Sequence, residues 1–162
     1  RGYPQIWTVV LFWVFAFGCC LGSFLNVCIW RIPRGESVVT APSHCTSCGA
    51  DIRWYDNLPI ISYLALRGRC RHCHTPYSCR YLVVEALTGT LFTAVLLKVG
   101  LAQQVPSVLP LYWWCILLAV SSAWIDAKFR IIPDALTYPA LLVGLVLHGV
   151  LPSACMETVF TT

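Results

Sequence analysis

The sequence begins with an apolar run long enough to cross a lipid bilayer. Residues Ile6 to Ile29 comprise 24 amino acids and no charged side chain. At about 1.5 Å of rise per helical residue, such a run spans a hydrocarbon core of roughly 30 Å. We therefore predict a transmembrane helix at the start of the chain.

Three weaker apolar runs follow the first. They are Tyr81 to Leu97, which Glu85 interrupts, Leu109 to Ile125, and Leu136 to Leu151. Hydrophobic residues make up 58% of the chain and charged residues only 11%, which is unlike an ordinary soluble domain. The predicted fold class is an all-α integral membrane protein with about four transmembrane helices.

The distribution of lysine and arginine predicts the orientation. Seven arginines lie between Arg31 and Arg80, and Lys128 and Arg130 follow the third apolar run, whereas the opposite side holds only Arg1 and Lys98. Positive residues concentrate on the cytosolic side of membrane proteins. We therefore expect a multi-pass membrane protein with its cysteine-rich loop in the cytosol. Because the topology explains the net charge of +4, we predict no nucleic-acid partner.

The predicted organisation is a first membrane helix at 1–30, a cytosolic insert at 31–80, three further helices at 81–151 and a tail at 152–162.

The insert contains two Cys-x-x-Cys pairs. Cys45 and Cys48 form the first pair, Cys70 and Cys73 the second, and 21 residues lie between them. Zinc accepts four thiolates in tetrahedral geometry, and each pair delivers two from one turn. Four protein ligands leave no open position, so we expect a structural Zn²⁺ in a small zinc-ribbon-like insert. The insert has few aliphatic residues, and a metal would supply the stability that it lacks.

Two other interpretations of these cysteines stay open. Two disulfides are the first, and a reducing cytosol disfavours them. The second is covalent haem attachment, because Cys70-Arg-His-Cys73-His74 fits that pattern, although it leaves Cys45 and Cys48 without a role. The insert also contains histidines that could replace a thiol, but four cysteines are sufficient: His44, His72 and His74.

Several polar or small residues lie within the apolar runs. Gly18, Gly22 and Asn26 recur every four residues and share one face of the first helix, which is typical of close helix packing. Glu85 lies one turn into the second helix and shares a face with Gly89. A carboxylate at this position is either stabilised by the positive helix end or committed to a function.

Two aspartates flank the short loop after the third run. Asp126 is expected at the C-terminal end of the third helix, where the helix dipole disfavours a negative charge, so it is a candidate acid–base group. Asp134 follows Pro133 and is better explained as the N-cap of the fourth helix.

Taken together, these motifs closely resemble the prepilin peptidases, the type IV leader peptidases. The resemblance covers roughly residues 18–147 and is carried by an ordered series of motifs: Gly22-Ser-Phe-Leu-Asn26, Arg31-Ile-Pro33, the two Cys-x-x-Cys pairs, Pro76-Tyr-Ser-Cys-Arg80, Val84-Glu85, Ile125-Asp126 and Ile132-Pro133-Asp134.

The resemblance implies a membrane aspartyl endopeptidase that removes the leader from type IV prepilins or pseudopilins of pilus and type II secretion systems. It implies that Asp126 is one of two catalytic aspartates. Many members also methylate the new amino terminus with S-adenosylmethionine. Within this chain, the substrate or methylation region would comprise Gly22, Asn26, Arg31, Arg80 and Glu85.

The chain departs from the family pattern at the second catalytic aspartate. That residue belongs to a Gly-x-Gly-Asp motif, which does not occur in these 162 residues. Asp134 is a weak candidate to replace it. We expect the chain to represent the amino-terminal half of a longer peptidase; the alternative is a non-catalytic zinc-ribbon adaptor of a pilin or secretion system.

Overall fold

The computed structural model describes residues 4–39, 43–101, 109–131 and 133–150. Its four long helices are α1 (Pro4–Arg31), α3 (Arg80–Leu101), α4 (Leu109–Phe129) and α5 (Asp134–Val150). Between α1 and α3 the chain forms a small module with two 3₁₀ turns, η1 (Ile32–Arg34) and η2 (Trp54–Asn57), and one short helix, α2 (Ile61–Ala65). The described residues contain isolated β-bridges but no strand. The predicted all-α fold is confirmed.

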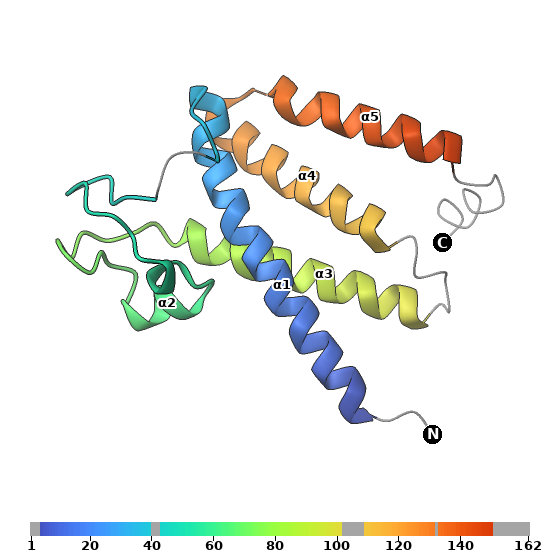
Figure 1. The fold of residues 1–162 in the computed structure, drawn as a ribbon, viewed down its shortest axis with the longest axis horizontal. Coiled ribbons are helices and arrows are strands. Elements are labelled where there is room, and N and C mark those ends of the chain that lie inside the picture. Colours follow the sequence, from blue (N-terminus) through green and yellow to red (C-terminus); the bar gives the residue numbers. More distant parts are fainter. Residues whose placement is uncertain (1–3, 40–42, 102–108, 132, 151–162) are drawn as a thin grey trace.

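Among the described residues, three helices are long and apolar enough to cross a membrane. They span Gln5–Arg34, Arg80–Gly100 and Leu109–Phe129. The fourth predicted span corresponds to α5, which has 17 residues and therefore extends over about 25 Å, somewhat less than a hydrocarbon core. In Figure 1, α5 lies beside α4 at the edge of the bundle, and its first turn lies near the C-terminal end of α1.

Helices α1 and α3 cross in an antiparallel contact built on small residues. A Cβ atom added to Gly18 would lie 2.8 Å from the Cα of Gly89, and one added to Gly22 would lie 2.8 Å from the Cα of Glu85. One turn further, the Asn26 side-chain amide donates to the Tyr81 carbonyl at 3.2 Å. The face predicted from the four-residue spacing is therefore the α1 contact with α3, and glycine allows the backbones to approach closely.

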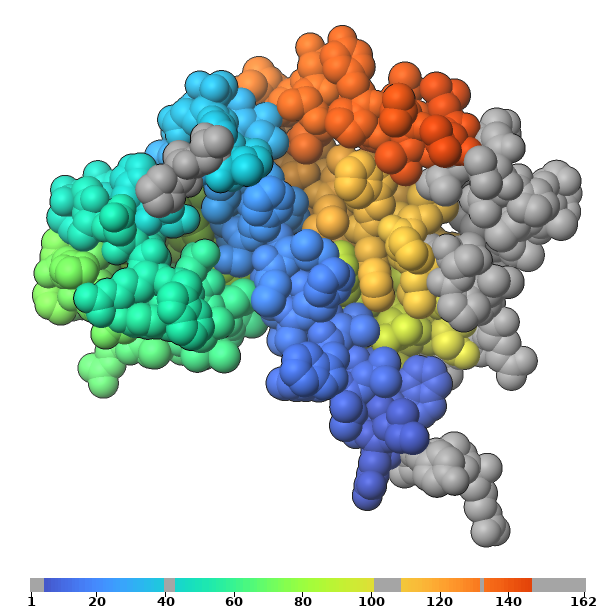
Figure 2. Space-filling view, in the orientation of Figure 1, coloured from blue at the N-terminus to red at the C-terminus, as the bar shows by residue number. Residues whose placement is uncertain are grey.

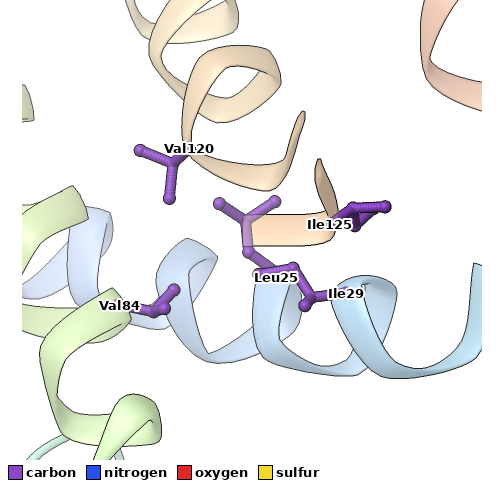
Figure 3. Packing of buried hydrophobic residues seen from close by; sticks show 5 residues of the cluster. All are labelled: Leu25, Ile29, Val84, Val120 and Ile125. Atoms are coloured by element: carbon purple, nitrogen blue, oxygen red, sulfur yellow. The ribbon is translucent and has the colours of Figure 1, made fainter. Parts of the chain in front are cut away.

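The buried apolar core lies at the end of the bundle where α1 finishes and α3 begins. Leu25 and Ile29 of α1, Val84 of α3, and Val120 and Ile125 of α4 form one cluster, shown in Figure 3. Ile29, Val84 and Ile125 are fully buried. This cluster fixes the C-terminal end of α4 against the other two helices.

Helix α4 extends further than the apolar pattern indicates. It runs through Phe129 rather than ending at Asp126, because Ala127 and Lys128 are compatible with a helix although they are not apolar. Arg130 then adopts a left-handed conformation with φ of 55°, and its N–H donates to the Asp126 carbonyl at 2.8 Å. Asp126 therefore lies one turn before the end of α4.

Candidate metal centre and adjoining pocket

Each Cys-x-x-Cys pair forms a turn with the same backbone pattern. The Cys45 N–H donates to the Ala50 carbonyl and the Gly49 N–H donates to the Cys45 carbonyl, both at 2.8 Å. In the second turn, Cys70 donates to the Thr75 carbonyl at 2.9 Å and His74 donates to the Cys70 carbonyl at 3.0 Å.

The β-bridges extend the equivalence of the two turns. The pairs His44–Asp51 and Arg69–Pro76 occupy corresponding positions around them. The residue that follows each turn is left-handed, with φ of 72° at Gly49 and 55° at His74. Glycine adopts this conformation without steric cost, whereas a side chain at His74 makes it less favourable. The module thus contains two matching Cys-x-x-Cys turns that face one another. We call them the first knuckle (residues 44–51) and the second knuckle (residues 69–76).

The four cysteine sulfurs gather at one point. They all lie within 4.8 Å of one another, and the Sγ atoms of Cys45 and Cys73 are 3.8 Å apart. Tetrahedral coordination with metal–sulfur bonds of about 2.3 Å places sulfurs about 3.8 Å apart. All four cysteines are free, so the disulfide interpretation does not describe this arrangement. The cluster has the donor set and spacing of a zinc-ribbon metal site.

Local hydrogen bonds favour thiolates at one cysteine of each pair. The backbone N–H groups of Cys73 and His72 lower the pKa of Cys70 to about 6. The N–H groups of Cys48 and Ser47 likewise lower the pKa of Cys45.

The pKa of Cys48 is shifted in the opposite direction. The Ala50 N–H favours its thiolate, but desolvation and the neighbouring thiols raise the pKa of Cys48 to about 11. Four thiolates this close repel one another unless a cation neutralises them, and a bound metal supplies that charge.

The module packs beside the C-terminal half of α1, as Figure 2 shows. A partly open cavity of about 290 Å³ lies between the module and the membrane helices. The membrane helices contribute Ser23, Asn26 and Arg31 from α1 and Tyr81 and Glu85 from α3. The module contributes both knuckles and α2, through residues that include Asp51, Ser62, Cys70 and Tyr77.

Glu85 connects the module to the membrane helices. Its side chain is 6% exposed, and one carboxylate oxygen accepts the Ile60 backbone N–H at 2.8 Å. Ile60 adopts φ of 60° and ψ of −51°, which is unfavourable for a β-branched residue. The hydrogen bond from Ile60 therefore holds a strained turn of the module against α3.

A second contact joins two parts of the module. The Arg71 guanidinium forms a two-pronged pair with the Asp56 carboxylate, with its Nε 2.9 Å from one oxygen. This arginine lowers the pKa of Asp56. Asp56 belongs to η2, so the pair ties η2 to the second knuckle.

The residues predicted for a substrate or methylation region do not all reach the cavity. Asn26, Arg31 and Glu85 line it. Gly22 instead packs against the backbone of Glu85 in the contact between α1 and α3. Arg80 is not part of the cavity lining, and its guanidinium lies over the Tyr81 ring.

The two aspartates lie away from this cavity. Asp126 is exposed near the end of α4, directly after the fully buried Ile125. Asp134 is the first residue of α5 and is exposed. Neither is among the residues that line the cavity.

The sequence prediction missed three contributors to the site. Ser23 and Tyr77 line the cavity, and Ile60 supplies a backbone N–H to Glu85. Burial and the contact with Cys70 raise the pKa of Tyr77. The sequence could have indicated Ser23, because this residue lies inside the Gly22–Asn26 motif. The roles of Tyr77 and Ile60 depend on how the module folds over the helices.

Comparison with known proteins places these features in context. Residues 16–99 match the family described as "Bacterial Peptidase A24 N-terminal domain". A prepilin leader peptidase/N-methyltransferase of Myxococcus xanthus (strain DK1622) is 45% identical over 139 residues, which cover 85% of this chain and 40% of that protein.

Proteins of the same name give similar results. The one from Klebsiella pneumoniae is 37% identical over 152 residues, covering 90% of this chain and 64% of that protein. The one from Neisseria gonorrhoeae is 35% identical over 155 residues, covering 81% and 53%. The chain thus spans about half the length of these relatives. No solved structure matches it significantly.

Proposed function

Because this chain belongs to the bacterial A24 peptidases, the family of the prepilin leader peptidases, we propose that the protein removes the leader from type IV prepilins or pseudopilins. The observation that carries the proposal is the similarity to the M. xanthus relative over 85% of the chain. The predicted motifs, from Gly22 to Asp134, lie in this order along the same region.

Asp126 is the proposed catalytic carboxylate. It is solvent-exposed, and Ile125 anchors the helix end that carries it in the apolar core. An aspartyl protease needs two carboxylates, one ionised and one protonated, to activate a water molecule. Asp126 would be one of them; Asp134 is the weaker candidate for the other within these residues.

The proposal is tested by replacing Asp126 with alanine in the protein expressed from its complete gene. Leader removal should be abolished, while the helices and the metal content stay unchanged. Ala127→Gly serves as a neighbouring control that leaves the carboxylate in place. Full cleavage by Asp126→Ala would remove this residue from the mechanism.

N-methylation of the new amino terminus is the second proposed activity, with S-adenosylmethionine as methyl donor. The names of the relatives include N-methyltransferase. The cavity between module and membrane helices supports this assignment, because Asn26, Arg31 and Glu85 line it and its volume suits a small molecule or a chain end.

Zn²⁺ is the proposed metal of the cysteine cluster. Cys45, Cys48, Cys70 and Cys73 would hold it, and their thiolates would fill all four positions of a tetrahedral site. The metal would neutralise the clustered thiolates and fix the two knuckles relative to each other. Its role would be structural.

The proposed location is the bacterial inner membrane, with the cysteine module, Asp126 and the α4–α5 connection on the cytosolic side. The excess of arginine and lysine on this side of the predicted helices supports it. The same orientation would present both proposed activities to the cytosolic end of a membrane-inserted prepilin.

A further inference from the structure

Glu85 is a buried carboxylate without a cationic partner. Its side chain is 6% exposed and lines the cavity. In the part of the chain that the structure describes, the one ion pair joins Arg71 and Asp56, so no lysine, arginine or histidine pairs with Glu85.

The carboxylate also retains unused hydrogen-bonding capacity. A carboxylate has about four acceptor positions, and the Ile60 N–H occupies one of those on Glu85. A buried charge is costly unless it is paired and fully hydrogen-bonded. The cavity gives a ligand access to the remaining positions.

A second acceptor lies at the same end of the cavity. Asn26 is 2% exposed, and its side-chain oxygen has no donor among the described residues. Its side-chain nitrogen donates to the Tyr81 carbonyl, one helical turn before Glu85, so both side chains belong to the same stretch of the α1–α3 contact. This end of the cavity therefore offers a negative charge and an unused acceptor.

We propose that Glu85 and Asn26 form a subsite for a protonated α-amino group. Such a group carries a positive charge and three N–H donors, and with a pKa of about 7.7 to 8.0 it is mostly protonated at neutral pH. The inference rests on the proposed N-methylation, whose reactants supply this chemistry twice: in the amino terminus of the processed substrate and in the methionine part of S-adenosylmethionine.

The simpler role of Glu85 is to hold the strained turn at Ile60. Glu85→Gln separates the two roles, because the glutamine carbonyl still accepts the Ile60 N–H while the negative charge is lost. Glu36→Gln is the matched control: it removes one negative charge from an exposed residue of the same cavity lining.

The test measures binding by isothermal titration with the full protein chain in lipid nanodiscs. The first probe pair is a short apolar peptide with a free amino terminus and its N-acetylated twin. The second pair is S-adenosylmethionine and 5′-methylthioadenosine, which lacks the amino-acid part. The protein should favour the amine-bearing member of at least one pair by about 30-fold or more, since losing one partner of a buried charge pair has an effect of this order. The pair that shows the preference identifies the source of the amine.

Glu85→Gln should abolish the preference, whereas Glu36→Gln should retain it. Equal binding within both pairs by the unmodified protein overturns the proposal, whatever the folding of the variants. A preference that survives in Glu85→Gln with unchanged helix and metal content also overturns it. Amine preference without methyl transfer would leave the subsite standing and refute the proposed methylation instead.

Discussion

Replacing Gly18 with alanine tests the helix contact that supports the whole arrangement. The added Cβ would lie 2.8 Å from the Cα of Gly89 and 3.1 Å from the Cβ of Phe92. Carbon atoms pack best at about 3.5 to 4.0 Å, so α1 and α3 would have to separate by about 1 Å at this point. Neither neighbouring atom can swing away, because one belongs to the backbone and the other is attached directly to it.

Overpacking of this kind typically costs about 1 to 3 kcal/mol. We therefore expect Gly18→Ala to lower the free energy of unfolding by this amount, measured by denaturant titration of the helical circular dichroism signal in mild detergent micelles. Gly144→Ala is the matched control, since nothing lies within 4 Å of a Cβ at that position of α5. Its stability should be unchanged or higher by up to about 1 kcal/mol, because alanine favours a helix.

Equal stability of Gly18→Ala and Gly144→Ala would refute the close approach of α1 and α3. The contact also positions the cavity, because Glu85 lies one helical turn from Gly89. A destabilised Gly18→Ala protein should therefore bind amine-bearing ligands more weakly than the Gly144→Ala protein.

Three further predictions concern the metal and the orientation. Elemental analysis should find about one zinc ion per chain. Replacing both Cys45 and Cys70 with serine should release the ion and increase proteolysis of the module. Full zinc content in that double variant would exclude these two cysteines as ligands. Acidification should also release the metal, because protons compete for the thiolates, so affinity falls as the pH falls. A membrane-impermeant amine reagent should label Lys98 in spheroplasts, whereas Lys128 should react only after the membrane is opened; the reverse pattern would invert the proposed topology.

The sequence allowed prediction of features that depend on local patterns. Apolar length identified the membrane helices, the four-residue spacing of Gly18, Gly22 and Asn26 identified the packing face of α1, and the cysteine spacing identified the cluster of four thiols. Each of these signals lies within one element or one motif, so periodicity and spacing are sufficient to reveal it.

The cavity could not be predicted in the same way. It depends on how the cysteine module lies over α1 and α3, which the hydrogen bond between Ile60 and Glu85 helps to set. These residues are 25 positions apart, and no repeat or motif connects them. For the same reason Glu85 was recognised as a functional candidate, but its partner was not. The extension of α4 beyond Asp126 was missed because apolar character ends before the helix does.

Leader removal is proposed for Asp126 and methylation for the cavity lined by Glu85, at two separate sites. The most direct test is methyl transfer from labelled S-adenosylmethionine to a pilin peptide that already has a free amino terminus, catalysed by the Asp126→Asn protein. This variant should methylate the peptide at the unmodified protein's rate while failing to remove the leader from an intact prepilin. Loss of methyl transfer in a folded Asp126→Asn protein with full metal content, or normal leader removal by it, would contradict the account.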